Sequence, residues 1–236
     1  MKAPFDGYAN YLENSLALDI IERENQMTFD TLELHTFFED GDDAEESQES
    51  NALFQKIGKG IRKMWDRIIM IIENFGRAIT NIGKKHMTVE EYMQTDRGST
   101  EYHQRCGKIA KEIDEAFLQM RPIINMISNV TGMDAAKVER LCDGLNATIA
   151  NANWGELAQG VIKRKVANKK LTNGTYEREM KGYREKIMKV TDELTNSKHN
   201  IKDKKKKLRA VNATTSVLGN LSAKIFGSAR NAGKTA

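Results

Sequence analysis

Residues 53–85 constrain the fold most strongly, because their apolar side chains recur at helical spacing. The positions follow one another in steps of three or four residues, which places them on one face of an α-helix. They are Leu53, Ile57, Ile61, Met64, Ile68, Ile71, Phe75, Ile79 and Ile82, with Trp65 and Ile72 widening the face. Most basic residues of the segment lie off this face. The pattern predicts an amphipathic helix whose outer side is positively charged.

The remaining chain shows the same helical periodicity, and strand-like alternation is hard to find. Only two prolines occur among 236 residues. A helix is expected from about residue 104 to 130, with Pro122 expected to kink or split it. Thr131–Gly132 should interrupt the helical structure, and Asp134 is a suitable N-cap for the helix that follows. The fold class is therefore all-α, with amphipathic helices in an irregular bundle.

Residues 176–211 carry a heptad pattern of alternating four- and three-residue steps. Its members are Tyr176, Met180, Tyr183, Ile187, Val190, Leu194, Ser197, Ile201, Lys204, Leu208 and Val211. This favours one long helix, a helical hairpin or a coiled coil, with 176–194 as a possible homo-oligomer seam. The tail from Gly219 onward should fray. The chain thus divides into an acidic leader (1–49), a basic amphipathic helix (50–85), a helical core (86–171), a heptad-type basic helix (172–218) and a flexible basic tail (219–236).

The formal charge changes sign abruptly near residue 49. Residues 1–49 hold fourteen acidic residues against Lys2 and Arg23, a charge of −12, whereas residues 50–236 hold 35 basic and 19 acidic residues, a charge of +16. The acidic linker around 39–51 lacks apolar anchors and is expected to be disordered. A cationic body of this kind predicts non-specific, salt-dependent binding to DNA. The candidate binding residues are Lys163, Arg164, Lys165, Lys169, Lys170, Lys202, Lys204, Lys205, Lys206, Lys207 and Arg209.

Catalytic, metal and cofactor signatures are not found in the sequence. The four histidines are scattered, and the pair His103 and Cys106 lacks the second ligand pair that a zinc site needs. The glycines near the C-terminus do not have phosphate-loop spacing. We therefore expect no enzyme activity, no metal and no cofactor, and we expect neither a secretory signal nor a membrane-spanning helix.

The acidic leader and the sign change resemble the organisation of internal head proteins of large tailed bacteriophages. In that class a propeptide directs the protein into the prohead and a protease removes it, in some giant phages after Ser/Ala/Gly-x-Glu. Ser47-Gln48-Glu49, directly before Ser50, matches this pattern and is the favoured processing site, and cleavage after Glu46 in Ala44-Glu45-Glu46 is the alternative. The resemblance implies capsid or scaffold proteins and a processing protease as partners. It also implies the virion interior as the final location, after the host cytoplasm.

Two other interpretations stay open. The helix of residues 53–85 could act at a membrane surface while the acidic leader restrains it, as in a membrane-active or injected effector protein. Its apolar face, centred on Ile57, Ile61, Met64, Trp65, Ile68, Ile72, Phe75 and Ile79, could equally be an ordinary core face. The chain could also be a plain structural protein that assembles through residues 176–194.

Overall fold

The computed structural model describes residues 48–81, 87–88, 100–152, 154, 166–167, 174–196 and 200–226. Five helices pack together in these residues: α2 (Gln48–Asn81), α4 (Thr100–Ser128), α5 (Ala135–Asn151), α8 (Thr175–Asn196) and α9 (Ile201–Phe226). Two short strands, β1 (Met87–Thr88) and β2 (Val166–Ala167), pair in parallel, with Met87 opposite Val166. The predicted all-α fold is confirmed, because helices form the bundle and each of the two described strands has only two residues.

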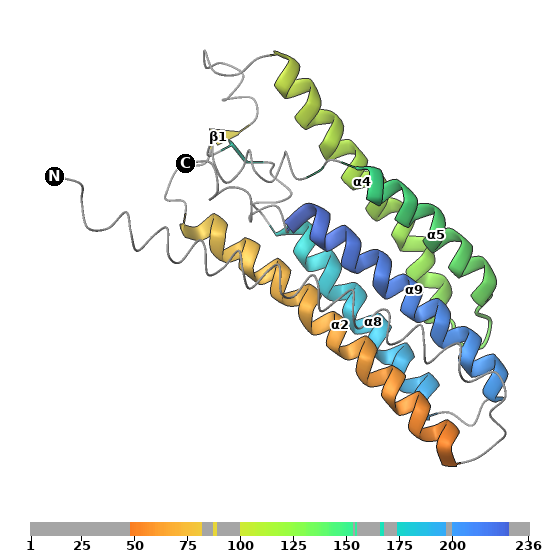
Figure 1. Cartoon of the computed structure of the whole chain (residues 1–236). Coiled ribbons are helices and arrows are strands. Elements are labelled where there is room, and N and C mark those ends of the chain that lie inside the picture. The colour runs from red at the N-terminus through yellow and green to blue at the C-terminus, as the bar shows by residue number, and fades with distance from the viewer. Residues whose placement is uncertain are drawn as a thin grey trace.

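Helix α9 is the central helix of the bundle. It contacts α2, α4, α5 and α8 and lies between α2 and α5 in Figure 1. Several of its buried residues are small or hydroxylated, including Ala210, Thr214 and Gly219, which lets neighbouring backbones approach closely. Thr214 and Thr215 donate their hydroxyls to the carbonyls of Ala210 and Val211, so no unsatisfied hydroxyl is buried at these two positions.

The expected fraying from Gly219 onward is wrong for residues 219–226. Helix α9 continues to Phe226, and Gly219, Leu221 and Phe226 are buried. Phe226 packs edge-on against Phe75 of α2, with the ring centroids 5.2 Å apart. Apolar residues at helical spacing outweigh the small residues that suggested a loose tail. Residues 227–236 lie outside the described part of the chain.

The heptad segment forms a helical hairpin, as one of the sequence alternatives predicted, and is not a single long helix. Helix α8 ends at Asn196 and α9 begins at Ile201. The Asn200 side chain accepts a hydrogen bond from the backbone N–H of Lys202 at 2.9 Å, which caps α9. The apolar seam of α8 (Tyr176, Met180, Tyr183, Ile187, Val190 and Leu194) is buried inside the chain's own bundle. This face therefore packs within one chain and is not left open for a second copy.

Helix α2 buries the predicted apolar face. Ile57, Ile61, Met64, Trp65, Ile68, Ile72 and Phe75 are all buried against the bundle, mainly through contacts of α2 with α8 and α9. The side chain of Ile79 lies outside the described residues. The interpretation of this face as a core face is confirmed.

Helices α4 and α5 form a second hairpin around the predicted break. The Asp134 side chain accepts from the N–H of Lys137 at 3.0 Å, which confirms the N-cap. Pro122 does not split α4, which runs from Thr100 to Ser128 through the proline. Proline has no N–H to donate to the carbonyl of Leu118, four residues earlier. Pro122 and Leu118 are both exposed, so water can reach that carbonyl instead.

Candidate nucleic-acid interface

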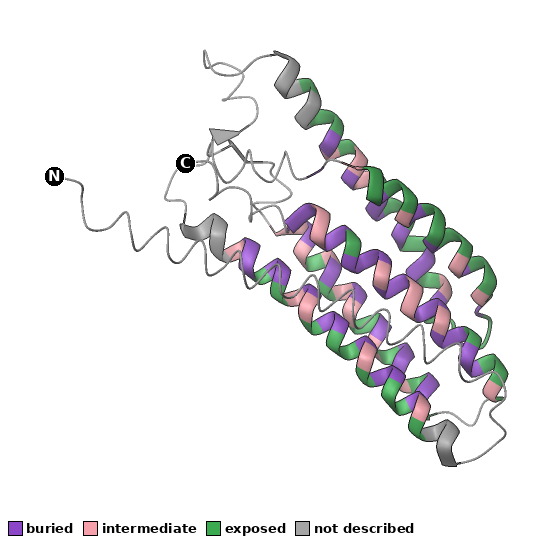
Figure 2. Ribbon diagram, viewed as in Figure 1, coloured by how far each residue is buried: buried purple, intermediate pink, exposed green. Residues whose placement is uncertain are grey.

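A stripe of four basic residues follows the outer side of α2. Lys56, Lys59 and Lys63 are exposed and Arg67 is half-buried. Their spacing of three, four and four residues keeps them within roughly 80° of arc on the helix surface. Figure 2 shows exposed positions along this outward side of α2. We call Lys56, Lys59, Lys63 and Arg67 the basic stripe.

The length of the basic stripe suits a phosphate backbone. Eleven residues of α-helix span about 16 Å, and one DNA strand presents a phosphate roughly every 3.4 Å along its axis. The stripe therefore covers on the order of five phosphates of one strand. Because the opposite face of α2 is fixed in the core, the four side chains project from one rigid element.

Two other charged residues of α2 interact with α8 and do not belong to the basic stripe. Arg62 pairs with Asp192, and Asp66 accepts a hydrogen bond from Arg184 at 3.1 Å. These pairs lie on the side of α2 that faces α8. Lys59 and Lys63 form no ion pair within the described part of the chain. They are the two cations of α2 best placed to bind an external anion.

Three of the lysines predicted to bind nucleic acid are buried, so the prediction is wrong for them. Lys204, Lys205 and Lys207 are 3%, 7% and 6% exposed. The Lys204 ammonium donates to the carbonyl of Thr195 at 3.3 Å and lies 4.5 Å from the ring centre of Phe54. Lys207 pairs with Asp203 at 2.7 Å. Their long stems fill space between helices while their ammonium groups find internal partners.

The other predicted binding residues have different environments. Lys202 and Lys206 are exposed on the first turns of α9. Arg209 is half-buried and acts on Glu139 of α5: burial raises the pKa of Glu139, and the Arg209 charge opposes that rise. Lys163, Arg164, Lys165, Lys169 and Lys170 lie outside the described residues. The sequence predicted a positively charged outer side for this helix, but the four residues of the basic stripe were not among the predicted DNA-binding residues, although their 3-4-4 spacing places them on one side.

The favoured processing site does not lie in a fully disordered linker. Gln48, Glu49 and Ser50 belong to the first turn of α2, whereas disorder was predicted for residues 39–51. A protease binds extended backbone, so cleavage after Glu49 first requires this turn to open. Glu46 and Ser47 precede the first residue of the helix and lie outside the described part of the chain.

The described residues offer no obvious catalytic centre. They contain no group of three or more His, Cys, Asp or Glu side chains able to hold a metal. Cys142 is buried against Thr214, with Sγ and Oγ1 3.6 Å apart, and burial raises the pKa of its thiol to about 11. Within the described ranges no helix is both long and apolar enough to cross a membrane.

No family model matches the chain, and no curated protein or solved structure is similar to it.

Proposed function

We propose that the protein is a non-enzymatic structural protein that binds DNA without sequence preference, mainly through the basic stripe of α2. The observation that carries the proposal is that three exposed lysines and the half-buried Arg67 share one side of a helix whose other side is anchored in the core. Lys202 and Lys206 add two exposed cations at the start of α9. The overall charge of +16 over residues 50–236 favours the same class of partner.

The acidic leader supplies a natural control of this binding. Residues 1–49 carry −12, and their most acidic part ends where α2 begins. While the leader is attached it competes with DNA phosphates for the same cations. Its removal leaves the cationic body free to neutralise packaged DNA. This organisation supports the proposal of an internal head protein of a tailed bacteriophage, made as a precursor in the host cytoplasm and processed inside the virion.

The basic stripe is tested by DNA retardation over a series of salt concentrations. Each lost phosphate contact should reduce the slope of log K against log salt by about 0.9. Lys59→Ala combined with Lys63→Ala should therefore reduce the slope by roughly two. The matched control is Lys186→Ala with Lys189→Ala, which removes the same charge from exposed positions of α8. Equal effects of the two double variants would contradict a localised interface.

The precursor hypothesis is tested by mass spectrometry of the chain in purified particles. We expect a mature chain that begins at Ser47, because cleavage after Glu46 leaves every residue of α2 intact. A chain that begins at Ser50 would show that the first helical turn opens before cleavage. An unprocessed chain in mature particles would contradict the proposed role of the leader.

A further inference from the structure

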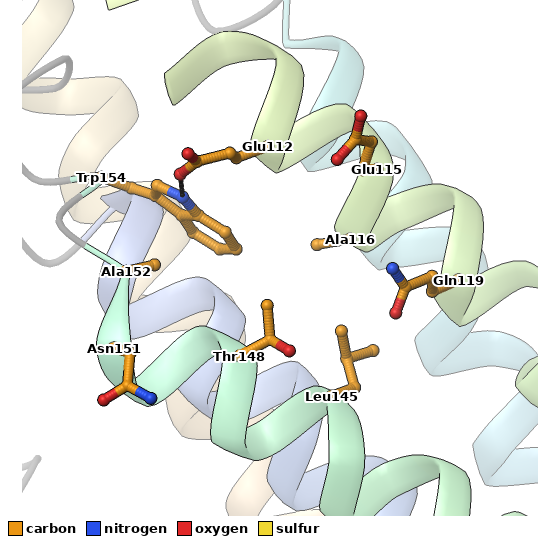
Figure 3. Close-up of a pocket in the computed structure, with 9 residues that line it drawn as sticks. All are labelled: Glu112, Glu115, Ala116, Gln119, Leu145, Thr148, Asn151, Ala152 and Trp154. Carbon is orange, nitrogen blue, oxygen red and sulfur yellow. Dashed lines mark hydrogen bonds between the residues drawn. The ribbon is translucent and has the colours of Figure 1, made fainter. Parts of the chain in front are cut away.

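A pocket of about 300 Å³ opens between α4 and α5 (Figure 3). Helix α4 contributes Glu112, Glu115, Ala116 and Gln119, α5 contributes Leu145 and Thr148, and Trp154 follows the end of α5. The middle of the pocket is apolar, since it is formed by Ala116, Leu145 and the indole ring. Glu112 and Gln119 place polar groups on opposite sides of it. The pocket is far smaller than any surface that DNA would need.

Trp154 forms a fixed wall of the pocket. Its side chain is 1% exposed, and its indole N–H donates to one carboxylate oxygen of Glu112 at 3.0 Å. The bond satisfies the buried N–H and also orients the carboxylate. In Figure 3 the far edge of the indole ring points into the opening. Because the indole is almost fully covered, a ligand would meet only its edge, beside an oriented carboxylate.

The second carboxylate oxygen of Glu112 keeps its capacity to accept hydrogen bonds. Its ion-pair partner is Lys108, whose ammonium is 3.9 Å away on a largely exposed side chain. That distance is too long for a hydrogen bond, and an exposed ion pair of this kind contributes little stabilising free energy. A cation inside the pocket could approach this oxygen at true hydrogen-bond distance. An anion would instead be repelled.

We propose that this pocket binds a small linear primary amine. The ammonium group donates to Glu112 in a charge-assisted hydrogen bond. The alkyl chain crosses the opening past Thr148 and the edge of the Trp154 indole, above a floor that the buried Leu145 and Ala116 close. A polar far end meets the amide of Gln119. The volume admits a short chain and lies at the lower end of the usual range for ligand sites.

The test measures binding of 1,4-diaminobutane to the full-length chain by calorimetry and tryptophan fluorescence. We expect saturable binding of one molecule per chain and none of the neutral analogue 1,4-butanediol. Glu112→Gln keeps an acceptor for the Trp154 N–H but removes the charge, so it should weaken binding about tenfold or more. Glu185→Gln removes the same charge from an exposed site on α8 and should bind like the wild type.

A second variant tests the pocket without changing any charge. Thr148→Leu adds volume from an exposed position of α5 that lines the pocket, and it should also abolish binding. Thermal unfolding of each variant shows whether it is folded. Absence of saturable binding by the wild type would overturn the proposal, as would wild-type affinity in both folded variants. DNA retardation is measured separately, because the amine site and the basic stripe share no residue.

Discussion

Lysines two positions apart on α9 have opposite roles. Lys204 is buried, donates to the last turn of α8 and covers the Phe54 ring, whereas Lys206 is exposed. Lys204→Ala should lower the free energy of unfolding by about 1–3 kcal/mol, because it removes a packed stem and a capping donor. Lys206→Ala should change it by less than about 0.5 kcal/mol but reduce the salt slope of DNA binding. Denaturant unfolding and DNA retardation of both variants test this contrast.

The pH dependence of Lys204 gives an independent check. Burial lowers the pKa of its ammonium below the usual 10.5. The folded state therefore binds this proton more weakly than the unfolded state, so the contribution of Lys204 to stability rises as the pH increases toward 10.5. The stability difference between the wild type and Lys204→Ala should grow over that interval. A difference independent of pH would contradict the buried position of the ammonium.

Cys142 should be chemically silent in the folded protein. With a pKa of about 11, on the order of one thiol in a thousand is ionised at pH 8, and the side chain is buried. In a Cys106→Ser chain, Cys142 should react with a thiol reagent only as fast as the protein opens. In guanidinium chloride it should react at the rate of a free cysteine. Rapid reaction of the native chain would show that α5 separates readily from α9.

At the scale of helices, α2 and α8 approach closely at Gly58. A Cβ atom there would lie 3.0 Å from Cγ2 of Thr195, whereas a Cβ at Gly76 meets nothing within 4 Å. Gly76→Ala should stabilise the protein by about 0.5–1 kcal/mol through helix propensity. Gly58→Ala gains the same propensity but crowds Thr195, so it should be less stable than Gly76→Ala by roughly 1 kcal/mol or more. Denaturant unfolding measures both.

Thr195→Ser provides the control for this helix contact. It removes the crowding methyl group and retains the hydroxyl, which donates to the carbonyl of Thr191 at 2.9 Å. In the Thr195→Ser background, Gly58→Ala should increase the free energy of unfolding by most of the amount expected for Gly76→Ala. If Gly58→Ala already stabilises the wild type as much as Gly76→Ala, the two helices do not meet closely here.

Elements with strong apolar periodicity were predicted correctly from the sequence. Positions whose environment depends on tertiary contacts were not. The face of α2, the Asp134 cap and the α8 seam follow from spacing and cap chemistry alone. The burial of Lys204 did not, because a lysine-rich run normally indicates a solvated face and only tertiary contacts reveal the end of α8 beneath it. The pocket likewise depends on Trp154, which is 42 positions from Glu112 in the chain.

For the whole molecule, the leader and the basic stripe make a quantitative prediction. Replacing the six acids of residues 39–46 by their amides removes the negative charges that most closely precede α2 in the sequence. These residues are Glu39, Asp40, Asp42, Asp43, Glu45 and Glu46. The full-length variant should bind DNA more tightly than the wild type at low salt. Since the Debye length falls from about 30 Å at 0.01 M to about 3 Å at 1 M, the gain should disappear as salt is added.

The matched control neutralises six acids farther from α2 in the sequence, namely Asp6, Glu13, Asp19, Glu22, Glu24 and Asp30. Both variants change the net charge of the chain by the same amount. If net charge alone governs DNA binding, their affinities measured by retardation will rise equally. If residues 39–46 compete for the basic stripe, that variant will gain more, and Lys59→Ala with Lys63→Ala will remove the extra gain. Unchanged DNA affinity in the first variant at low salt would contradict electrostatic control by the leader.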